Sequence, residues 1–145
     1  MIKVLDDKHF SELFELLSDG VVIIDTTTTL PVMFNKASYT QLEYEKSEFE
    51  KLSILDYEAI ENEENIALHV ENIIKNGRDD FETQHKTKYG KILDIKITAV
   101  PYEIENHTYI LCTYRKKKKK KNIERKFKRS EERLAIATES ADIGV

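Results

Sequence analysis

The strongest constraint on this fold is a change of hydrophobic period after residue 80. Between residues 91 and 100 apolar and polar residues alternate, and the inward positions would be Leu93, Ile95, Ile97 and Ala99. A period of two is typical of a strand that buries one face and exposes the other. Residues 81–88 and 107–115 flank this segment across short turns at Tyr89-Gly90 and near Asn106. The spacing predicts a three-strand antiparallel meander.

A helix and two shorter strands are predicted at the start of the chain. Residues 6–18 carry apolar residues at helical spacing and acidic residues in the first turn, which favours an amphipathic helix. Residues 21–25 are expected to form a short buried strand, and 30–34 a second one. Pro31 suits the start of a strand or the edge of a sheet.

A block of helices is predicted between these strands and the meander. Asn35, Ser47 and Asp56 are expected to cap helices that run to about Tyr44, Leu55 and Lys75. Asn76-Gly77 would end the last one. Its expected inward residues are Ile60, Leu68, Ile73 and Ile74. The order of elements predicts an α+β domain with helices on one side of an antiparallel sheet.

Charge divides the chain into two parts. Residues 1–114 hold 11 Lys/Arg and 22 Asp/Glu, a net of −11, whereas 115–145 hold 12 and 5, a net of +7, and the two sum to −4. The acidic part is predicted to be the folded body. Residues 116–121 are six adjacent lysines, interpreted as a solvated joint. In 122–141, the positions Ile123, Phe127, Ser130, Leu134, Ala137 and Ala141 follow a heptad spacing, which predicts a coiled-coil helix.

Several classes of protein are excluded or disfavoured by composition and motif. The longest strictly apolar run is Val21–Ile24, far too short for a membrane span. The single cysteine, Cys112, excludes an internal disulfide framework and favours a reducing, cytoplasmic location. Nucleotide-binding loops, zinc-protease helices and serine-hydrolase elbows are missing from the sequence. Glu61, Glu63 and Glu64 are interpreted as a solvated face, so no catalytic or metal site is expected.

Several segments resemble a PAS domain, the sensory module of bacterial signalling proteins such as sensor histidine kinases and diguanylate cyclases. They are residues 10–25, 33–49, 72–101 and 109–115, and the best-matched positions are Asn35 before a short helix and Tyr89-Gly90-Lys91 at the hairpin. The resemblance implies a five-stranded antiparallel sheet in the order 2-1-5-4-3 with helices on one face.

The resemblance also sets the expected organisation of the chain. Residues 1–19 would form an N-terminal helix, 20–115 the PAS domain, 116–121 the joint and 122–141 a signalling helix. Residues 123–126 resemble the end of the family's junction motif, but lysines replace its Asp-Ile-Thr part, which leaves the usual ion pair there in doubt. Residues 133–145 resemble the start of a second PAS domain, so we expect a fragment of a longer protein.

PAS domains hold small molecules between the sheet and the short helices, which implies a pocket here. The candidate lining residues are Asn35, Tyr39, Leu42, Leu55, His69, Ile73, Phe81, Ile95, Ile97 and Cys112. Haem-binding relatives carry an axial histidine in a region comparable to His69, but a polar or half-buried helix histidine is the favoured interpretation. Photoactive flavin relatives need a helical Asn-Cys-Arg motif, whereas Cys112 lies on the last predicted strand as a core thiol. His85 is expected to face the cavity or solvent, and the cofactor stays open.

Two surfaces are candidates for self-association in a homodimer. The stripe Phe10, Leu13, Phe14 and Leu17 would either cover the open face of the sheet or pair with its copy. Ile123, Phe127 and Leu134 would form the seam of a parallel coiled coil.

The expected function is a non-catalytic module that detects a small molecule, a redox signal or a partner. It would relay the signal through strand 107–115 and helix 122–141 to an output domain outside this chain, a kinase or a cyclase. The alternative is a non-sensing interaction module whose basic tail binds nucleic acid or an anionic membrane. That alternative is disfavoured because no aromatic residue interleaves the lysines.

Overall fold

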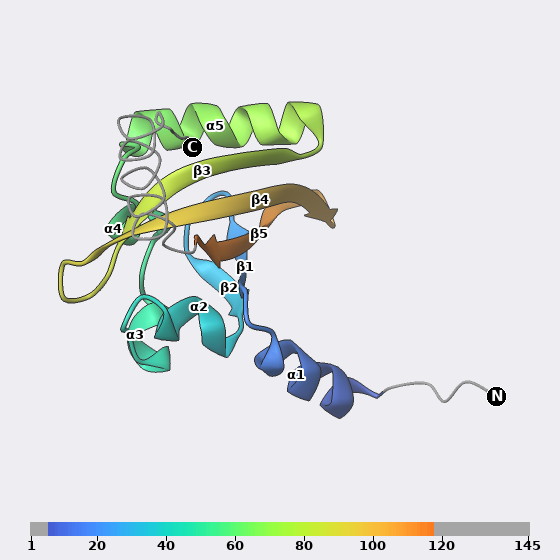
Figure 1. The fold of residues 1–145 in the computed structure, drawn as a ribbon. Helices are drawn as coiled ribbons and strands as arrows, with labels where there is room; N and C mark the ends of the chain where they lie inside the picture. Colours follow the sequence, from blue (N-terminus) through green and yellow to red (C-terminus); the bar gives the residue numbers. More distant parts are fainter. Residues whose placement is uncertain (1–5, 118–145) are drawn as a thin grey trace, which may run out of the picture.

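In a computed structural model, residues 6–117 are described, and they form one antiparallel sheet with helices on one face (Figure 1). The elements are α1 (Asp7–Leu16), β1 (Gly20–Asp25), β2 (Pro31–Phe34), α2 (Lys36–Thr40), α3 (Lys46–Phe49), α4 (Ile54–Tyr57), α5 (Glu63–Asn76), β3 (Asp79–Lys86), β4 (Ile92–Ile104) and β5 (His107–Lys116). The heptad segment and the expected start of a second domain lie outside the described residues, as does most of the lysine joint. None of the described helices is both long and apolar enough to cross a membrane.

The strand order is β2-β1-β5-β4-β3, as expected, and every neighbouring pair is antiparallel. The predicted meander is therefore confirmed. Gly90 and Asn106, at φ 91° and 65°, supply the left-handed turn positions between its strands. The inner face of the sheet is built from alternate residues of the long strands. Its buried members are Val22, Ile24, Leu93, Ile95, Ile97, Ala99, Ile110, Cys112 and Tyr114.

The caps of the middle helices differ from the prediction. Ser47 lies inside α3, and Asp56 lies inside α4, where its carboxylate accepts the Ser53 amide at 2.7 Å. The long helix begins only after Asn62, whose side chain accepts the Asn65 amide at 2.8 Å. A tertiary contact explains the delay, because the Ala59 amide donates to the Gln84 carbonyl of β3 at 2.8 Å. This pairing holds the segment before α5 in an extended form.

The inward residues of this region agree with the prediction only at Ile73, and Ile60 lies before α5. Ile66 and Ile73 are buried, and Gly77 ends the helix in the left-handed conformation as predicted. The expected inward residues Ile60, Leu68 and Ile74 are instead 60, 54 and 45 % exposed. Positions 66, 70 and 73 share the face towards the sheet.

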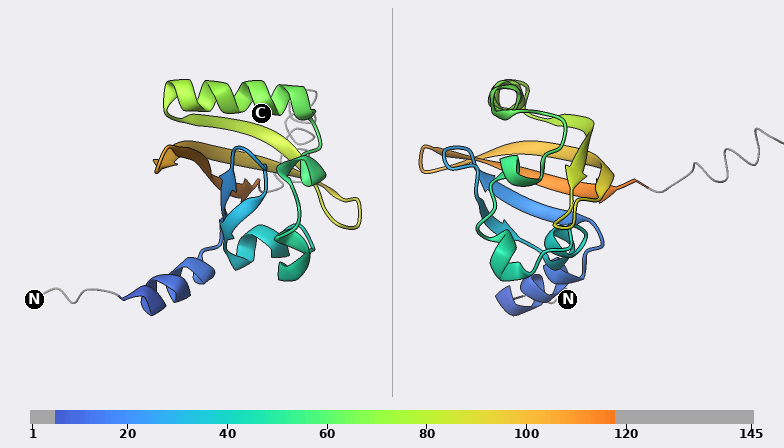
Figure 2. Two further views of the ribbon diagram at one scale, coloured as in Figure 1. Left: turned by 180° about the vertical axis from the view of Figure 1, so that it is seen from behind. Right: turned by 90° about the vertical axis from the view of Figure 1, so that its left-hand side faces the viewer.

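The first helix projects from the sheet and does not cover it (Figures 1 and 2). Within Asp7–Leu16 no residue is buried, so of the two interpretations of its apolar stripe, the one in which it covers the sheet is wrong. Asn35 ties this helix to the body. Its amide nitrogen donates to the Phe14 and Asp19 carbonyls at 3.2 and 3.0 Å. Its amide oxygen accepts the Val21 and Ser38 amides at 2.8 and 3.2 Å.

Candidate functional site

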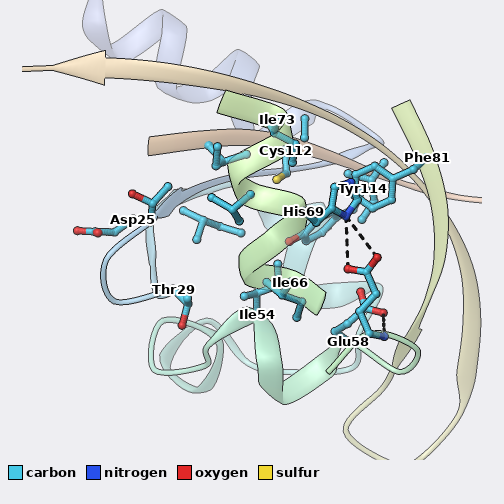
Figure 3. A pocket seen from close by; sticks show the side chains of 17 residues that line it. Asp25, Thr29, Ile54, Glu58, Ile66, His69, Ile73, Phe81, Cys112 and Tyr114 are labelled. Atoms are coloured by element: carbon cyan, nitrogen blue, oxygen red, sulfur yellow. Dashed lines mark hydrogen bonds and ion pairs between the residues drawn. The ribbon is translucent and has the colours of Figure 1, made fainter. Parts of the chain in front are cut away.

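A cavity of about 50 Å³ lies between α5 and the inner face of the sheet (Figure 3). It is roofed by α4 and α5 and floored by β1, β3, β4 and β5. The apolar lining consists of Ile24, Ile54, Ile66, Val70, Ile73, Phe81, Ile97, Ala99, Ile110 and Cys112. Polar side chains gather at its two ends, with Asp25 and Thr29 on one side and Glu58 and His69 on the other (Figure 3).

His69 is held between two carboxylates. Its Nε2 lies 2.6 Å from the Asp79 carboxylate of β3, and its Nδ1 lies 3.3 Å from that of Glu61. Burial of the ring lowers the pKa of His69, but the hydrogen bonds to Asp79 and Glu61 outweigh it and raise the pKa above its usual range. Glu61 therefore contacts His69 at the cavity, whereas Glu63 and Glu64 are exposed as predicted.

Glu58 is a nearly buried carboxylate, with a side chain only 4 % exposed. Its Oε2 accepts hydrogen bonds from the Ile60 amide at 2.9 Å, the Glu61 amide at 3.1 Å and the Thr83 hydroxyl at 2.6 Å. Its Oε1 lies 3.9 Å from Nε2 of His85, beyond hydrogen-bonding distance. Among the described residues, His85 is the one basic group within 4.0 Å of this carboxylate.

His85 lies in the core, fully buried and away from solvent. Its ring packs edge-on against Tyr57 and Tyr114, with centroids 5.0 and 4.7 Å away. Neither ring nitrogen has a hydrogen-bond partner among the described residues. Burial lowers the pKa of His85 to about 3, so the ring is neutral at physiological pH and gives Glu58 no positive charge.

The buried tyrosine hydroxyls and the buried cysteine thiol of the core are uncharged. The Tyr57 and Tyr114 hydroxyls lie 2.9 Å apart, and burial raises the pKa of both. Burial also raises the pKa of the Cys112 thiol to about 12. Nucleophilic and metal-binding cysteines react as thiolates, so Cys112 behaves as the core thiol that the sequence predicts.

Haem does not fit this site. Both ring nitrogens of His69 are already engaged by carboxylates. The cavity of about 50 Å³ is also far below the roughly 300–1,000 Å³ of ordinary ligand pockets. Within residues 6–117, no group of three or more His, Cys, Asp or Glu side chains is arranged to hold a metal ion. A flavin–cysteine bond would need a thiol on a helix, whereas Cys112 lies on β5.

The structure places five of the ten candidate pocket residues at the cavity: His69, Ile73, Phe81, Ile97 and Cys112. Leu42 and Ile95 are buried elsewhere in the core, Tyr39 packs against that core, Leu55 is half-buried on α4, and Asn35 caps α2. Sequence reasoning missed Glu58 as a cavity residue. No local pattern marks it, because its burial depends on Thr83 and His85 of a distant strand.

No protein-family model and no curated protein matches this sequence. Solved structures do match. They include the PAS domain of an HTR-like protein from Haloarcula marismortui, with a TM-score of 0.70, 18% identity and coverage of 76% of this chain and 90% of that one. A PAS domain of a protein from Colwellia psychrerythraea has a TM-score of 0.67, 24% identity and coverage of 76% and 95%. A PAS domain of a two-component sensor histidine kinase has a TM-score of 0.65, 17% identity and coverage of 76% and 95%.

Proposed function

Because the chain has the PAS fold, we propose that it is a non-catalytic, cytoplasmic sensory module of a larger signalling protein. A small molecule that occupies the cavity beneath α5 changes the packing of the inner face. That change reaches β5 and passes through the C-terminal segment to an output domain, a kinase or a cyclase. A ligand acts in this way only by binding one of two conformations more tightly than the other.

One observation carries this proposal: β5 is both a wall of the cavity and the exit of the domain. Ile110, Cys112 and Tyr114 line the cavity, and the same strand continues to Lys116. These three alternate residues of the strand are therefore in a position to sense the occupant. A displacement of these side chains moves the backbone that leads into residues 118–145.

Ion pairs at the end of β5 extend the connection to other elements. The Arg115 guanidinium lies 3.2 Å from the Asp19 carboxylate, in the link between α1 and β1. The Lys117 ammonium lies 2.9 Å from the Glu82 carboxylate of β3. The junction thus has ion pairs of its own despite the lysines that replace the family's motif. Both pairs are exposed, so they orient the junction more than they stabilise it.

A cavity-filling substitution tests the relay without knowledge of the ligand. Ala99→Leu places three extra carbons against the cavity, whereas Lys96→Leu places the same leucine side chain on the outer face of the same strand, where it meets solvent. We expect hydrogen exchange measured by mass spectrometry to change in 107–117 and in 118–145 for Ala99→Leu alone. Equal exchange in 118–145 for the unmodified chain and Ala99→Leu, with altered exchange confined to β4, would contradict the relay.

A further inference from the structure

We propose that the cavity binds a small primary amine, with its ammonium group against Glu58 and its short carbon chain along the apolar walls. This inference rests on the proposed function, since it names the chemical class of the molecule that the cavity would sense. It goes beyond the fold, because it rests on the particular side chains that line this cavity.

The charge of Glu58 is the first reason. Its side chain is 4 % exposed and it lines the cavity. All three of its hydrogen bonds go to Oε2, and no described residue donates to Oε1. Hydrogen bonds offset part of the hydration that a buried carboxylate loses, and a cation beside it offsets the remainder. His85, 3.9 Å away, is kept neutral by its own burial, so residues 6–117 provide no cation within 4.0 Å of this carboxylate.

The neighbouring groups leave this end of the cavity negative. His69 is the other base there, and it is already shared by Glu61 and Asp79. Even with His69 protonated, three carboxylates face one imidazolium. Asp25 adds a further carboxylate at the far end, where His107 lies 2.9 Å from it. An anionic ligand would meet repulsion at both ends of the cavity, whereas a cation is attracted to the end at Glu58.

The size and the walls of the cavity define the rest of the molecule. The cavity of about 50 Å³ is far smaller than the roughly 300–1,000 Å³ of ordinary ligand pockets. An amine that enters it therefore carries only a short carbon chain. Ile66, Ile73 and Ile97 offer these carbons an apolar surface. A neutral alcohol of the same length could donate a hydrogen bond to Oε1 but would not balance its charge.

The test is a charge series of equal length on the unmodified chain. Propylammonium, 1-propanol and propionate are titrated at pH 7 and constant ionic strength, and amide shifts of the labelled protein are followed by NMR. We expect saturable shifts at Ala99 and Cys112 with propylammonium, at least ten-fold weaker binding of 1-propanol, and no binding of propionate. Binding of propionate or 1-propanol as tight as that of propylammonium, or no saturable shift with propylammonium, would overturn the proposal.

Two matched variants locate the charge that matters. Glu58→Gln should weaken propylammonium binding at least ten-fold and bring it close to that of 1-propanol. Glu63→Gln removes the same charge from an exposed position on the first turn of α5 and should change nothing. Equal propylammonium affinity in both variants would refute the role of Glu58. If Glu58→Gln does not fold, the charge series on the unmodified chain decides by itself.

A failure of the amine site can be distinguished from a failure of the proposed sensory relay. If propylammonium fails to bind while Ala99→Leu still alters exchange in 118–145, the ligand class is wrong and the relay stands. If propylammonium binds with no effect on 118–145, the cavity is an amine site without the proposed relay.

Discussion

His85 is a titratable side chain that this fold keeps neutral. Burial lowers its pKa to about 3 in the folded protein, against about 6.5 in an unfolded chain. As the pH falls below 6.5, the unfolded chain takes up a proton that the folded one refuses. The stability that neutral His85 allows is therefore complete above pH 6.5 and is lost progressively as the pH falls towards 3. His69 affects the pH dependence of stability in the opposite direction. Its pKa is raised in the folded protein, so its contribution to the free energy of unfolding is lost as the pH rises.

We predict that His85→Phe makes the protein less sensitive to acid. Phenylalanine keeps the edge-on aromatic packing against Tyr57 and Tyr114 and has no proton to gain. For the unmodified chain, His85 should cost about 2 kcal/mol of unfolding free energy between pH 7 and pH 5, since each pH unit is worth about 1.4 kcal/mol. Urea denaturation at the two pH values measures this.

The loss of unfolding free energy between pH 7 and pH 5 is compared between the variant and the unmodified chain, because carboxylates and His69 titrate in both proteins. The exposed His9 provides the control, and His9→Gln should lose as much unfolding free energy between pH 7 and pH 5 as the unmodified chain. An equal loss of unfolding free energy in His85→Phe would show that His85 is not the source.

At the scale of elements, one buried amide joins the end of α1 to β1 and α2. Asn35 is fully buried and uses both ends of its side chain. The nitrogen holds the end of α1 and the linker, through Phe14 and Asp19. The oxygen holds β1 and caps α2, through Val21 and Ser38. The direction in which α1 leaves the sheet is thus determined by residues that follow it by about twenty positions.

Asn35→Asp should release α1 and leave α2 capped. A carboxylate keeps the two acceptor roles but cannot donate to the Phe14 and Asp19 carbonyls, and each buried group left without a partner costs about 1–3 kcal/mol. We expect faster amide exchange in Asp7–Leu16 with α2 protected. Asn35→Ala, which removes both sets of bonds, should expose α2 as well. Unchanged exchange in α1 for both variants would show that other contacts orient it.

At the scale of the whole molecule, α1 presents an apolar stripe with nothing over it among the described residues. Phe10, Leu13 and Leu17 are 58, 49 and 49 % exposed. Met33 of the edge strand β2, 50 % exposed, lies beside them and extends the surface. We propose that a second copy of the chain covers this stripe. The heptad residues Ile123, Phe127 and Leu134 are a second candidate seam, on a segment outside the described residues.

Leu13→Glu should weaken the dimer at least ten-fold, because burial of a carboxylate at an apolar contact is costly. Analytical ultracentrifugation of the chain 1–145 measures the dissociation constant. Leu68→Glu is the matched control, since Leu68 is 54 % exposed on α5, away from the stripe. A chain with Phe127→Asp separates the two seams.

A strictly monomeric unmodified chain at high concentration would refute both seams at once. A dimer lost in Phe127→Asp but kept in Leu13→Glu would assign association to the C-terminal segment.

The sheet could be predicted from sequence because its signals are local. The alternation of Leu93, Ile95 and Ile97 shows which side chains turn inward, and Gly90 and Asn106 mark where the chain reverses. The first residues of the helices could not be predicted in this way. Residues that can cap a helix are frequent throughout 35–65. Asn62 and not Asp56 caps α5 because the Ala59 amide donates to the Gln84 carbonyl, a hydrogen bond that joins segments 25 residues apart.

The α+β class, the strands and their buried faces follow from local patterns in the chain, because hydrophobic periodicity and turn residues act over a few positions. The chemistry of the cavity follows only from the packing of distant segments. Glu58 could be a solvated helix residue in any isolated peptide. It becomes a buried charge only where β3 brings Thr83 and a neutral His85 against it. The electrostatic state of a side chain depends on what surrounds it in space, and the chain order carries no direct record of that.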